Sequence, residues 1–255
     1  MYGYIEWTED KSRIAVTERE ILRLRFRCVS IPRQKGTPQF ILRRRCGAAA
    51  RLLHREGVTR AVFPDAFAWM EEFDRCDVRP VDLLSLYRTL AAELVQRRLD
   101  TCGQTGKGVT VAVCTRRLTE EVRRTVTELC IRNRYVMLFT PERDDVFCRR
   151  LRREYGIPLV QTEDPNQLAK AAVIVRFSPE AGYRPGQEVI DLFPGGVPFH
   201  ERLRLPPETE EKLPADCERM QLMAALYGAG AIRAGQIQVV APETAEKTAS
   251  VGEKA

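Results

Sequence analysis

Short apolar runs alternate with amphipathic segments along the middle of the chain. Four of these runs are rich in β-branched and other apolar residues: 109–114, 135–140, 157–161 and 172–177. Strands that are buried on both faces of a parallel sheet have this composition, whereas half-buried strands alternate apolar and polar residues. The pattern therefore predicts four parallel strands.

The segments between these runs have the period of amphipathic helices. After the first run, apolar residues recur at i, i+4, i+7 and i+8, and Thr115 or Thr119 can cap the helix. A second helix is predicted to begin at Pro141 and to end at Gly156, and a short third one to follow Asp164. Because parallel strands need crossover connections, the pattern predicts an α/β fold, an open and mostly parallel sheet with helices on both faces.

The first part of the chain predicts a smaller, basic α/β domain over residues 1–99. Residues 21–31 alternate between apolar side chains and arginines, which is typical of a half-buried strand, and a partner strand is predicted at 40–42. A hairpin of 5–7 with 13–16 precedes them, and one long helix over 81–99 ends the domain.

Large apolar side chains cluster between residues 64 and 73, where Phe67, Trp69, Met70 and Phe73 occur. Such clusters are more often core packing than a stacking surface for a ligand. Beyond the central region, the pattern predicts strands at 188–193 and 237–240, a helix at 215–227 and a disordered tail over 241–255.

The strand and helix order over residues 106–240 resembles that of Rossmann-type dinucleotide-binding domains. The resemblance covers about half of the chain and implies NAD, NADP or another nucleotide as the cofactor class. The glycine fingerprint of that family, G-x-G-x-x-G, is replaced after the first strand by Cys-Thr-Arg-Arg-Leu-Thr at 114–119. Because the glycines allow the backbone to approach a pyrophosphate, this replacement predicts a degenerate nucleotide site.

Ligands of open α/β sheets bind outside the carboxyl ends of the strands. In this sequence the candidate ligand- or anion-binding residues at those ends are Thr115, Arg116, Arg117, Glu163, Ser178, Gly195 and Gly196. Arg116 and Arg117 lie where a helix begins, so they can hold a phosphate or a carboxylate. The alternative is that both arginines pair with acidic residues on the surface. No catalytic residue is predicted, because Cys114 lacks the C-x5-R spacing of phosphatases.

Positive charge is concentrated at the start of the chain. Residues 1–57 hold 13 Lys plus Arg and 6 Asp plus Glu, a net charge of +7, whereas the whole chain carries +6. A basic two-stranded ribbon is a candidate nucleic-acid surface, formed by Arg23, Arg25, Arg27, Arg43, Arg44 and Arg45. The alternative is a solvated sheet edge whose charges prevent pairing with other strands.

The composition, 44% apolar and 30% charged, is that of a globular protein without a membrane-length apolar run. The N-terminus lacks the pattern of a secretory signal, so a cytoplasmic location is expected. Eight scattered cysteines without a C-x-x-C spacing, and only two histidines, argue against a zinc module and for reduced thiols.

These features predict a ligand- or partner-binding protein with a regulatory or assembly role. Its expected partners are a phosphate-bearing small molecule or another protein, and no membrane. Two alternatives remain open at this point. One is an NADP- or nucleotide-dependent enzyme that uses the arginine-bearing turn, and the other is nucleic-acid binding through the basic ribbon.

Overall fold

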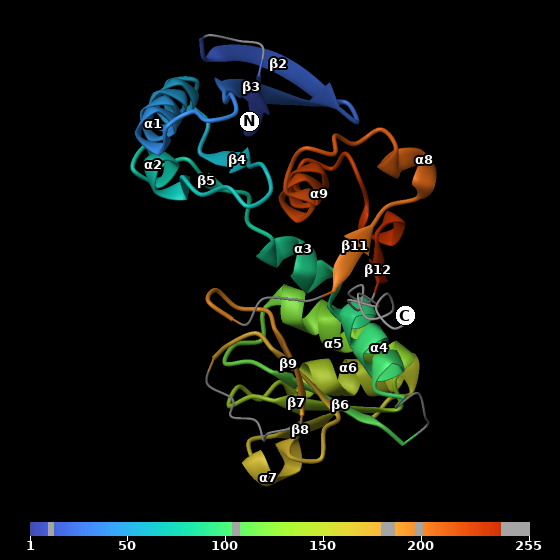
Figure 1. Ribbon diagram of the computed structural model, residues 1–255. Helices are drawn as coiled ribbons and strands as arrows, with labels where there is room; N and C mark the ends of the chain where they lie inside the picture. Colours follow the sequence, from blue (N-terminus) through green and yellow to red (C-terminus); the bar gives the residue numbers. More distant parts are fainter. Residues whose placement is uncertain (10–12, 104–107, 180–186, 197–200, 241–255) are drawn as a thin grey trace, which may run out of the picture. The chain divides into compact units, whose positions relative to one another are not determined.

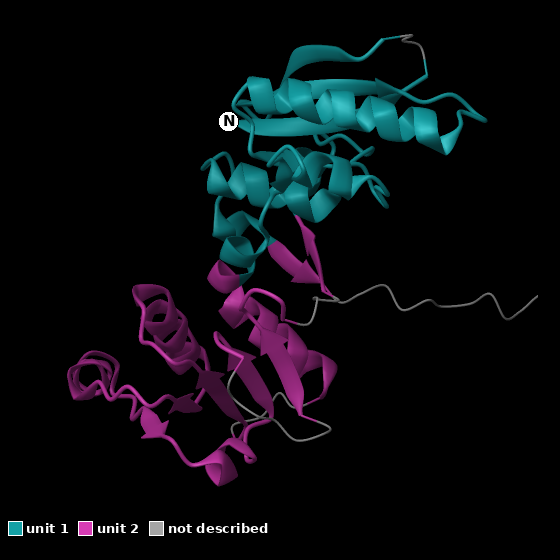
Figure 2. Ribbon diagram, turned by 90° about the vertical axis from the view of Figure 1, so that its left-hand side faces the viewer, with its two compact units in different colours: residues 1–87, 205–237 teal, residues 88–204, 238–255 magenta. Residues whose placement is uncertain are grey.

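The computed structural model describes residues 1–9, 13–103, 108–179, 187–196 and 201–240. The chain forms two compact units, shown in two colours in Figure 2. Unit 1 comprises Met1–Tyr87 and Leu205–Ile237, and unit 2 comprises Arg88–Arg204 and Gln238–Ala255. The predicted domain bounds, 1–99 and 106–240, differ from these units because residues 205–237 return to unit 1. The predicted disordered tail, 241–255, lies outside the described residues.

Unit 1 contains a five-stranded sheet in the order β2-β3-β1-β4-β5. Its strands are β1 (Tyr2–Thr8), β2 (Ala15–Ile21), β3 (Leu24–Pro32), β4 (Arg60–Val62) and β5 (Arg79–Pro80). All neighbours are parallel except β2, which is antiparallel to β3. The predicted hairpin of 5–7 with 13–16 is therefore wrong. The hairpin joins β2 to β3 through Leu22 and Arg23, whose φ angles of 47° and 67° suit the tight turns of twisted hairpins.

The helices of unit 1 are α1 (Gln39–Arg55), α2 (Met70–Asp74), α8 (Pro207–Glu210) and α9 (Arg219–Gly228), with a 3₁₀ turn η1 at Ala234–Gln236. Helix α3 (Leu84–Thr89) begins in unit 1, and its residues from Arg88 on belong to unit 2. The predicted strand at 40–42 is wrong, since these residues belong to α1. Leu42, Cys46 and Leu53 are buried on one face of α1, at a helical spacing that a three-residue window does not reveal.

The two faces of the unit 1 sheet are covered by different parts of the chain. Ile5 packs in a core with Ala50 and Leu53 of α1. Its neighbour Tyr4 points to the opposite face because side chains alternate along a strand, and its hydroxyl donates to Asp216 at 2.8 Å. The segment before α9 is thereby tied to β1, which explains why residues 205–237 join unit 1.

Unit 2 contains a five-stranded, fully parallel sheet in the order β10-β9-β6-β7-β8 (Figure 1). Its strands are β6 (Thr110–Cys114), β7 (Tyr135–Phe139), β8 (Val160–Thr162), β9 (Val173–Arg176) and β10 (Glu188–Asp191). A separate antiparallel pair is formed by β11 (Arg202–Arg204) and β12 (Gln238–Val240). The predicted α/β class with a parallel, Rossmann-like sheet is confirmed.

The helices of unit 2 are α4 (Ala91–Thr101), α5 (Glu120–Arg132), α6 (Asp145–Tyr155) and α7 (Pro165–Leu168). The connections β6 to β7 and β7 to β8 run in one direction across the sheet, and β8 to β9 runs back. Right-handed crossovers therefore place α5 and α6 on one face and α7 on the other. Leu168 of α7 packs against Ala112, Cys114 and Ile174 on its face.

Several element ends agree with the predicted caps. The Thr119 hydroxyl accepts from the backbone of Val122, Asp164 caps α7, and Gly156 ends α6 with φ 67°. The predicted helix over 81–99 is divided at Leu90, whose backbone angles, φ −90° and ψ 10°, separate α3 from α4. Among the helices that the structure describes, none combines the length and apolar composition needed to span a bilayer.

Candidate functional site

The order of strands in unit 2 defines where a ligand crevice belongs. From β6 the chain moves to β7 and β8 on one side, and then to β9 and β10 on the other. The loops that follow β6 and β9 therefore diverge and leave a crevice at the carboxyl ends of these two strands. In open α/β sheets this topological switch point is the usual ligand site.

A cavity of about 470 Å³ lies at this switch point. Its walls come from the loop after β6, the first turn of α5, the loop after β9 and the last turn of α3. The lining residues are Arg88, Thr115, Arg116, Arg117, Thr119, Glu120, Glu121, Val122, Phe177 and Ser178. The volume is within the range of small-molecule sites. The structure thus brings together four predicted residues, Thr115, Arg116, Arg117 and Ser178.

Six of the lining residues were not predicted from the sequence, and Arg88 is the cation among them. Its Nε donates to the carbonyl oxygen of Leu192 at 2.8 Å, and its Nη1 lies 3.1 Å from a carboxylate oxygen of Glu121. Its guanidinium also lies 5.7 Å from the ring centroid of Phe177. These contacts hold a cation in the wall of the cavity. No local motif marks Arg88, because its partners are far away in the sequence.

The turn after β6 is closed by its own hydrogen bonds. The buried Thr115 hydroxyl donates to the carbonyl oxygen of Arg117 at 2.8 Å and accepts from the Arg117 backbone at 3.3 Å. The side chains of Arg116 and Arg117 are exposed at the cavity. A Ser/Thr turn thus replaces the glycine turn, and guanidinium groups line the cavity in place of backbone donors.

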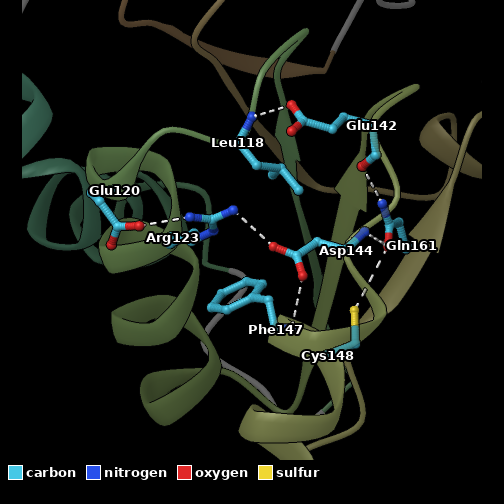
Figure 3. Close-up of polar contacts among 8 residues, drawn as sticks. All are labelled: Leu118, Glu120, Arg123, Glu142, Asp144, Phe147, Cys148 and Gln161. Carbon is cyan, nitrogen blue, oxygen red and sulfur yellow. Dashed lines mark hydrogen bonds and ion pairs between the residues drawn. The ribbon is translucent and has the colours of Figure 1, made fainter.

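The other side of the same loop is occupied by the carboxylate of Glu142 (Figure 3). Its Oε2 accepts a hydrogen bond from the backbone N–H of Leu118 at 2.8 Å. Gln161 of β8 donates to the Glu142 carbonyl oxygen at 2.5 Å and accepts from the backbone of Asp144 at 3.4 Å. The loops after β6 and β7 are thereby joined to β8.

Asp144 extends this network to the helices. Its Oδ1 accepts from the backbone of Phe147 at 2.9 Å, which caps α6, and its Oδ2 lies 2.8 Å from Arg123 of α5. Arg123 also pairs with Glu120 at 2.6 Å. These pairs raise the pKa of the Arg123 guanidinium, so it stays charged. The network fills the β7 and β8 side of the crevice with side chains of the protein itself.

These residues do not fit a dinucleotide. In Rossmann-type domains the pyrophosphate receives hydrogen bonds at the start of the helix after the first strand. Here the Leu118 N–H already donates to the Glu142 carboxylate, and Glu120 and Glu121 stand in the first turn of α5. A pyrophosphate at this place would meet like charges and no glycine turn.

The remaining predicted residues lie away from the cavity. Glu163 follows β8, which is separated from β6 by β7. Gly195 and Gly196 follow β10, and Gly195 has φ +81°. A Cβ at Gly196 would lie 2.5 Å from the Cβ of Asp191, so this glycine allows the turn to pack on the end of β10.

Beside these glycines, Arg176 and Asp191 form a buried, bidentate ion pair. Arg176 Nε lies 2.6 Å from Asp191 Oδ1, and Nη2 lies 2.8 Å from Oδ2. Cys114 is the neighbour of Arg176 across the sheet and is fully buried. Burial raises the pKa of its thiol to about 12, an effect that Arg176 only partly opposes. Cys114 is therefore a core residue without nucleophile character.

In unit 1 the predicted basic ribbon is not formed. Arg25 and Arg27 lie on β3, Arg23 lies in the turn before it, and Arg43, Arg44 and Arg45 lie on α1. Arg27 pairs with Glu56 at the end of α1, whereas Arg45 donates to the carbonyl oxygen of Pro32 near its start. Glu56 and Arg45 are 11 residues apart, so the two arginine groups are about 17 Å apart along the helix.

Comparisons with known proteins identify no family. No family model matches this chain, and neither does any curated protein. Among solved structures, L-tryptophan dehydrogenase from Nostoc punctiforme is 13% identical with a TM-score of 0.28; the match covers 64% of this chain and 50% of that one. D-mandelate dehydrogenase from Rhodotorula graminis is 9% identical with a TM-score of 0.34, covering 75% and 74%.

Ornithine carbamoyltransferase from Pyrococcus furiosus is 15% identical with a TM-score of 0.29, covering 82% of this chain and 77% of that one. This chain spans only about half the length of the tryptophan dehydrogenase. At such identities and TM-scores the matches carry no functional argument. The fold class is therefore based on the strand order and the parallel pairing of unit 2.

Among the described residues, no group of three or more His, Cys, Asp or Glu side chains is placed to hold a metal ion.

Proposed function

We propose that unit 2 is a binding module for a small anionic ligand that carries a phosphate or a carboxylate, with a role in regulation or assembly. The observation that supports this proposal is the cavity at the carboxyl ends of β6 and β9, which contains Arg88, Arg116 and Arg117 in its walls. Three cations face this cavity together with two carboxylates, those of Glu120 and Glu121. Guanidinium groups suit carboxylate and phosphate ligands because they donate two parallel hydrogen bonds.

The pairing of the acidic residues supports the same proposal. Glu121 is held by Arg88, and Glu120 by Arg123, which lies outside the cavity wall. The charge of each acid is thus partly offset within the protein. The arginines of the turn, Arg116 and Arg117, extend from an internally bonded loop at the entrance. An anion bound there would be held by side chains on a rigid support.

The size of the ligand follows from the network around Glu142. A dinucleotide would extend across both sides of the β6 loop, and the β7 side is occupied by Glu142, Asp144 and Gln161. Among the described residues, the side of this loop toward β9 carries the cavity and no such network. The ligand is therefore a compact anion, such as a mononucleotide, a sugar phosphate or a small carboxylic acid.

The test is a thermal-shift and calorimetric screen of the purified chain. The probes are inorganic phosphate, mononucleotides, small carboxylic acids, NAD, NADP and S-adenosylmethionine, each at low and moderate salt. A ligand that binds only the folded state raises the free energy of unfolding by about 2.7 kcal/mol when its concentration is about a hundred times its Kd. We expect this rise with a compact anion and its loss in the double variant Arg116→Ala/Arg117→Ala.

The matched control is Arg134→Ala/Arg153→Ala, which removes two exposed arginines of unit 2 that lie outside the cavity wall. It should bind the anion as the natural chain does. An unchanged shift by inorganic phosphate or a small carboxylic acid in the Arg116/Arg117 variant would contradict the proposal. NADP binding accompanied by turnover would favour the enzyme alternative instead. Without a shift by any probe, the crevice is no small-molecule site, and a protein partner would be sought.

A further inference from the structure

Both tryptophans of the chain lie at one end of the unit 1 sheet. Trp7 is near the end of β1, and Trp69 follows β4. Their ring centroids are 5.4 Å apart in an edge-on arrangement, and Phe67 stacks on Trp7 at 5.4 Å. These three rings are only partly buried, whereas Phe63 and Phe73 beneath them are fully buried. The cluster therefore has a core part and an accessible part.

This accessible part lies at a second topological switch point. In unit 1 the chain passes from β1 to β3 on one side and then to β4 on the other side of β1. The carboxyl ends of β1 and β4 are therefore where the loops diverge, and ligands of open α/β sheets bind at such ends. Trp7 comes from the first of these strands, and Phe67 and Trp69 come from the loop after the second.

Arg33 covers the tryptophans. It follows β3, and its backbone N–H donates to the carbonyl oxygen of Thr8 at 2.9 Å. Its guanidinium carbon lies 5.1 Å from the ring centroid of Trp7 and 6.0 Å from that of Trp69. The side chain is exposed, and within the part of the chain that the structure describes no carboxylate pairs with it. A stacked guanidinium keeps its N–H edge available for an anion.

The surroundings of Arg33 are also cationic. Arg45 in the second turn of α1 donates to the carbonyl oxygen of Pro32 at 2.7 Å, so this turn lies beside the residue that precedes Arg33. Its neighbour Arg44 and the loop residue Lys35 are exposed, and the first turn of α1 contains no acidic residue. Arg43 is neutralised by Glu72 at 2.6 Å. An aromatic surface thus adjoins an excess of positive charge.

We propose that this surface binds a nucleotide. The base packs on the Arg33 guanidinium and on Trp69, and the phosphate accepts hydrogen bonds from the edge of Arg33 and from Arg44. Planar bases stack on aromatic rings and guanidinium planes, and phosphates pair with arginines, so one nucleotide satisfies both parts of the surface. The nucleotide is either free or part of a single strand. This site belongs to unit 1 and does not depend on the function proposed for unit 2.

Tryptophan fluorescence tests this inference directly, because the two tryptophans of the chain are both in the cluster. The full chain is titrated with adenosine monophosphate, with a short single-stranded oligothymidine, with adenosine and with inorganic phosphate. Free tryptophan in the same solutions corrects for light absorbed by the nucleotide. We expect a saturable change with the nucleotide or the oligonucleotide, and none with phosphate alone.

Two variants define the site. Arg33→Ala should weaken binding about tenfold, because it removes both a stacking plane and a charged donor. Arg60→Ala is the control, since Arg60 is an exposed arginine at the first residue of β4, the opposite end of that strand from the loop that carries Trp69. Circular dichroism and the Tm establish that both variants fold. If Arg33→Ala does not fold, Arg33→Lys replaces it and should weaken binding by a smaller factor.

The outcomes separate the sources of the ligand and the two proposed sites. If the oligothymidine saturates the fluorescence change at a much lower concentration of nucleotide units than adenosine monophosphate does, the ligand is single-stranded nucleic acid. If both saturate it at the same concentration of nucleotide units, the ligand is a free nucleotide. Arg116→Ala/Arg117→Ala should leave the fluorescence change intact; its loss would place the ligand in unit 2 and overturn the inference. The absence of any change, or equal affinity in Arg33→Ala, would overturn it as well.

Discussion

The carboxylate of Glu142 accepts a hydrogen bond from the backbone N–H of Leu118 at 2.8 Å. This contact joins the loop after β7 to the turn after β6, where a Rossmann-type domain would receive a pyrophosphate. A carboxylate of the protein thus stands where a ligand anion would bind in that family. The contact also explains how the turn is stable without glycines, because its Leu118 donor is satisfied internally.

We expect Glu142→Ala to lower the free energy of unfolding by about 1–2 kcal/mol, because it leaves the Leu118 N–H without its acceptor. Glu142→Gln retains a carbonyl oxygen and should cost less than half as much. Urea denaturation measures both. Glu154→Ala, which removes an exposed acid 3.9 Å from Arg153, is the control and should be nearly neutral. Equal stability of all three variants would show that the contact contributes nothing.

The buried pair of Arg176 and Asp191 predicts that substitutions of these two residues have strongly non-additive effects on the free energy of unfolding. Asp191→Leu alone removes the bidentate acceptor of a buried guanidinium and should cost about 3–5 kcal/mol, whereas Arg176→Met/Asp191→Leu should recover most of this loss. A double-mutant cycle by urea denaturation measures the coupling. The comparison is Glu188→Gln, which breaks a half-exposed pair with Arg98 and should cost about 1 kcal/mol or less. Additive losses in the cycle would contradict the prediction.

The buried thiols predict a loss of stability at alkaline pH. Burial raises the pKa of four thiols from 9.0 to about 12, those of Cys28, Cys46, Cys114 and Cys130. Because the pKa is higher in the folded state, the unfolded chain ionises first. Their contribution is complete below pH 9.0 and is lost as the pH rises toward 12.

Each of these thiols should lower the free energy of unfolding by about 1.4 kcal/mol per pH unit in that range. Urea denaturation between neutral pH and about pH 11 measures the slope. Cys46→Ala should reduce this slope by the contribution of one buried thiol. Cys102→Ala removes an exposed thiol and should change the slope less. A slope that is identical in Cys46→Ala and the natural chain would refute the assignment.

The two glycines after β10 should respond differently to alanine. Gly196→Ala places a Cβ 2.5 Å from the Asp191 Cβ and 3.2 Å from the carbonyl oxygen of Phe193, so the turn must move. We expect a loss of about 1–3 kcal/mol. Gly195→Ala meets no atom within 4 Å and is strained only by its φ of +81°, so a loss of about 1 kcal/mol is expected. Thermal denaturation of both variants measures the two losses of stability. A larger loss in Gly195→Ala than in Gly196→Ala would be inconsistent with this packing.

The candidate site was only partly predictable. Thr115, Arg116, Arg117 and Ser178 were found because strand ends can be read from local patterns, and the ends of parallel strands meet at one edge. Arg88 and Glu142 were not in the predicted site, since their partners, Leu192 and Leu118, lie 104 and 24 residues away. Gly195 and Gly196 are strand-end residues that do not line the cavity, and of the two only Gly196 packs against Asp191.

The sequence by itself determined the central elements of unit 2, including the Thr119 and Asp164 caps and the stop at Gly156, because periodicity and capping depend on neighbours within a few residues. It misassigned residues 40–42, where three residues do not distinguish a strand from a helix. The tertiary structure alone decided the strand order, the return of residues 205–237 to unit 1 and the contact of Glu142 with the loop after β6. These features depend on contacts between distant segments, whose free energy arises only when the whole unit packs together.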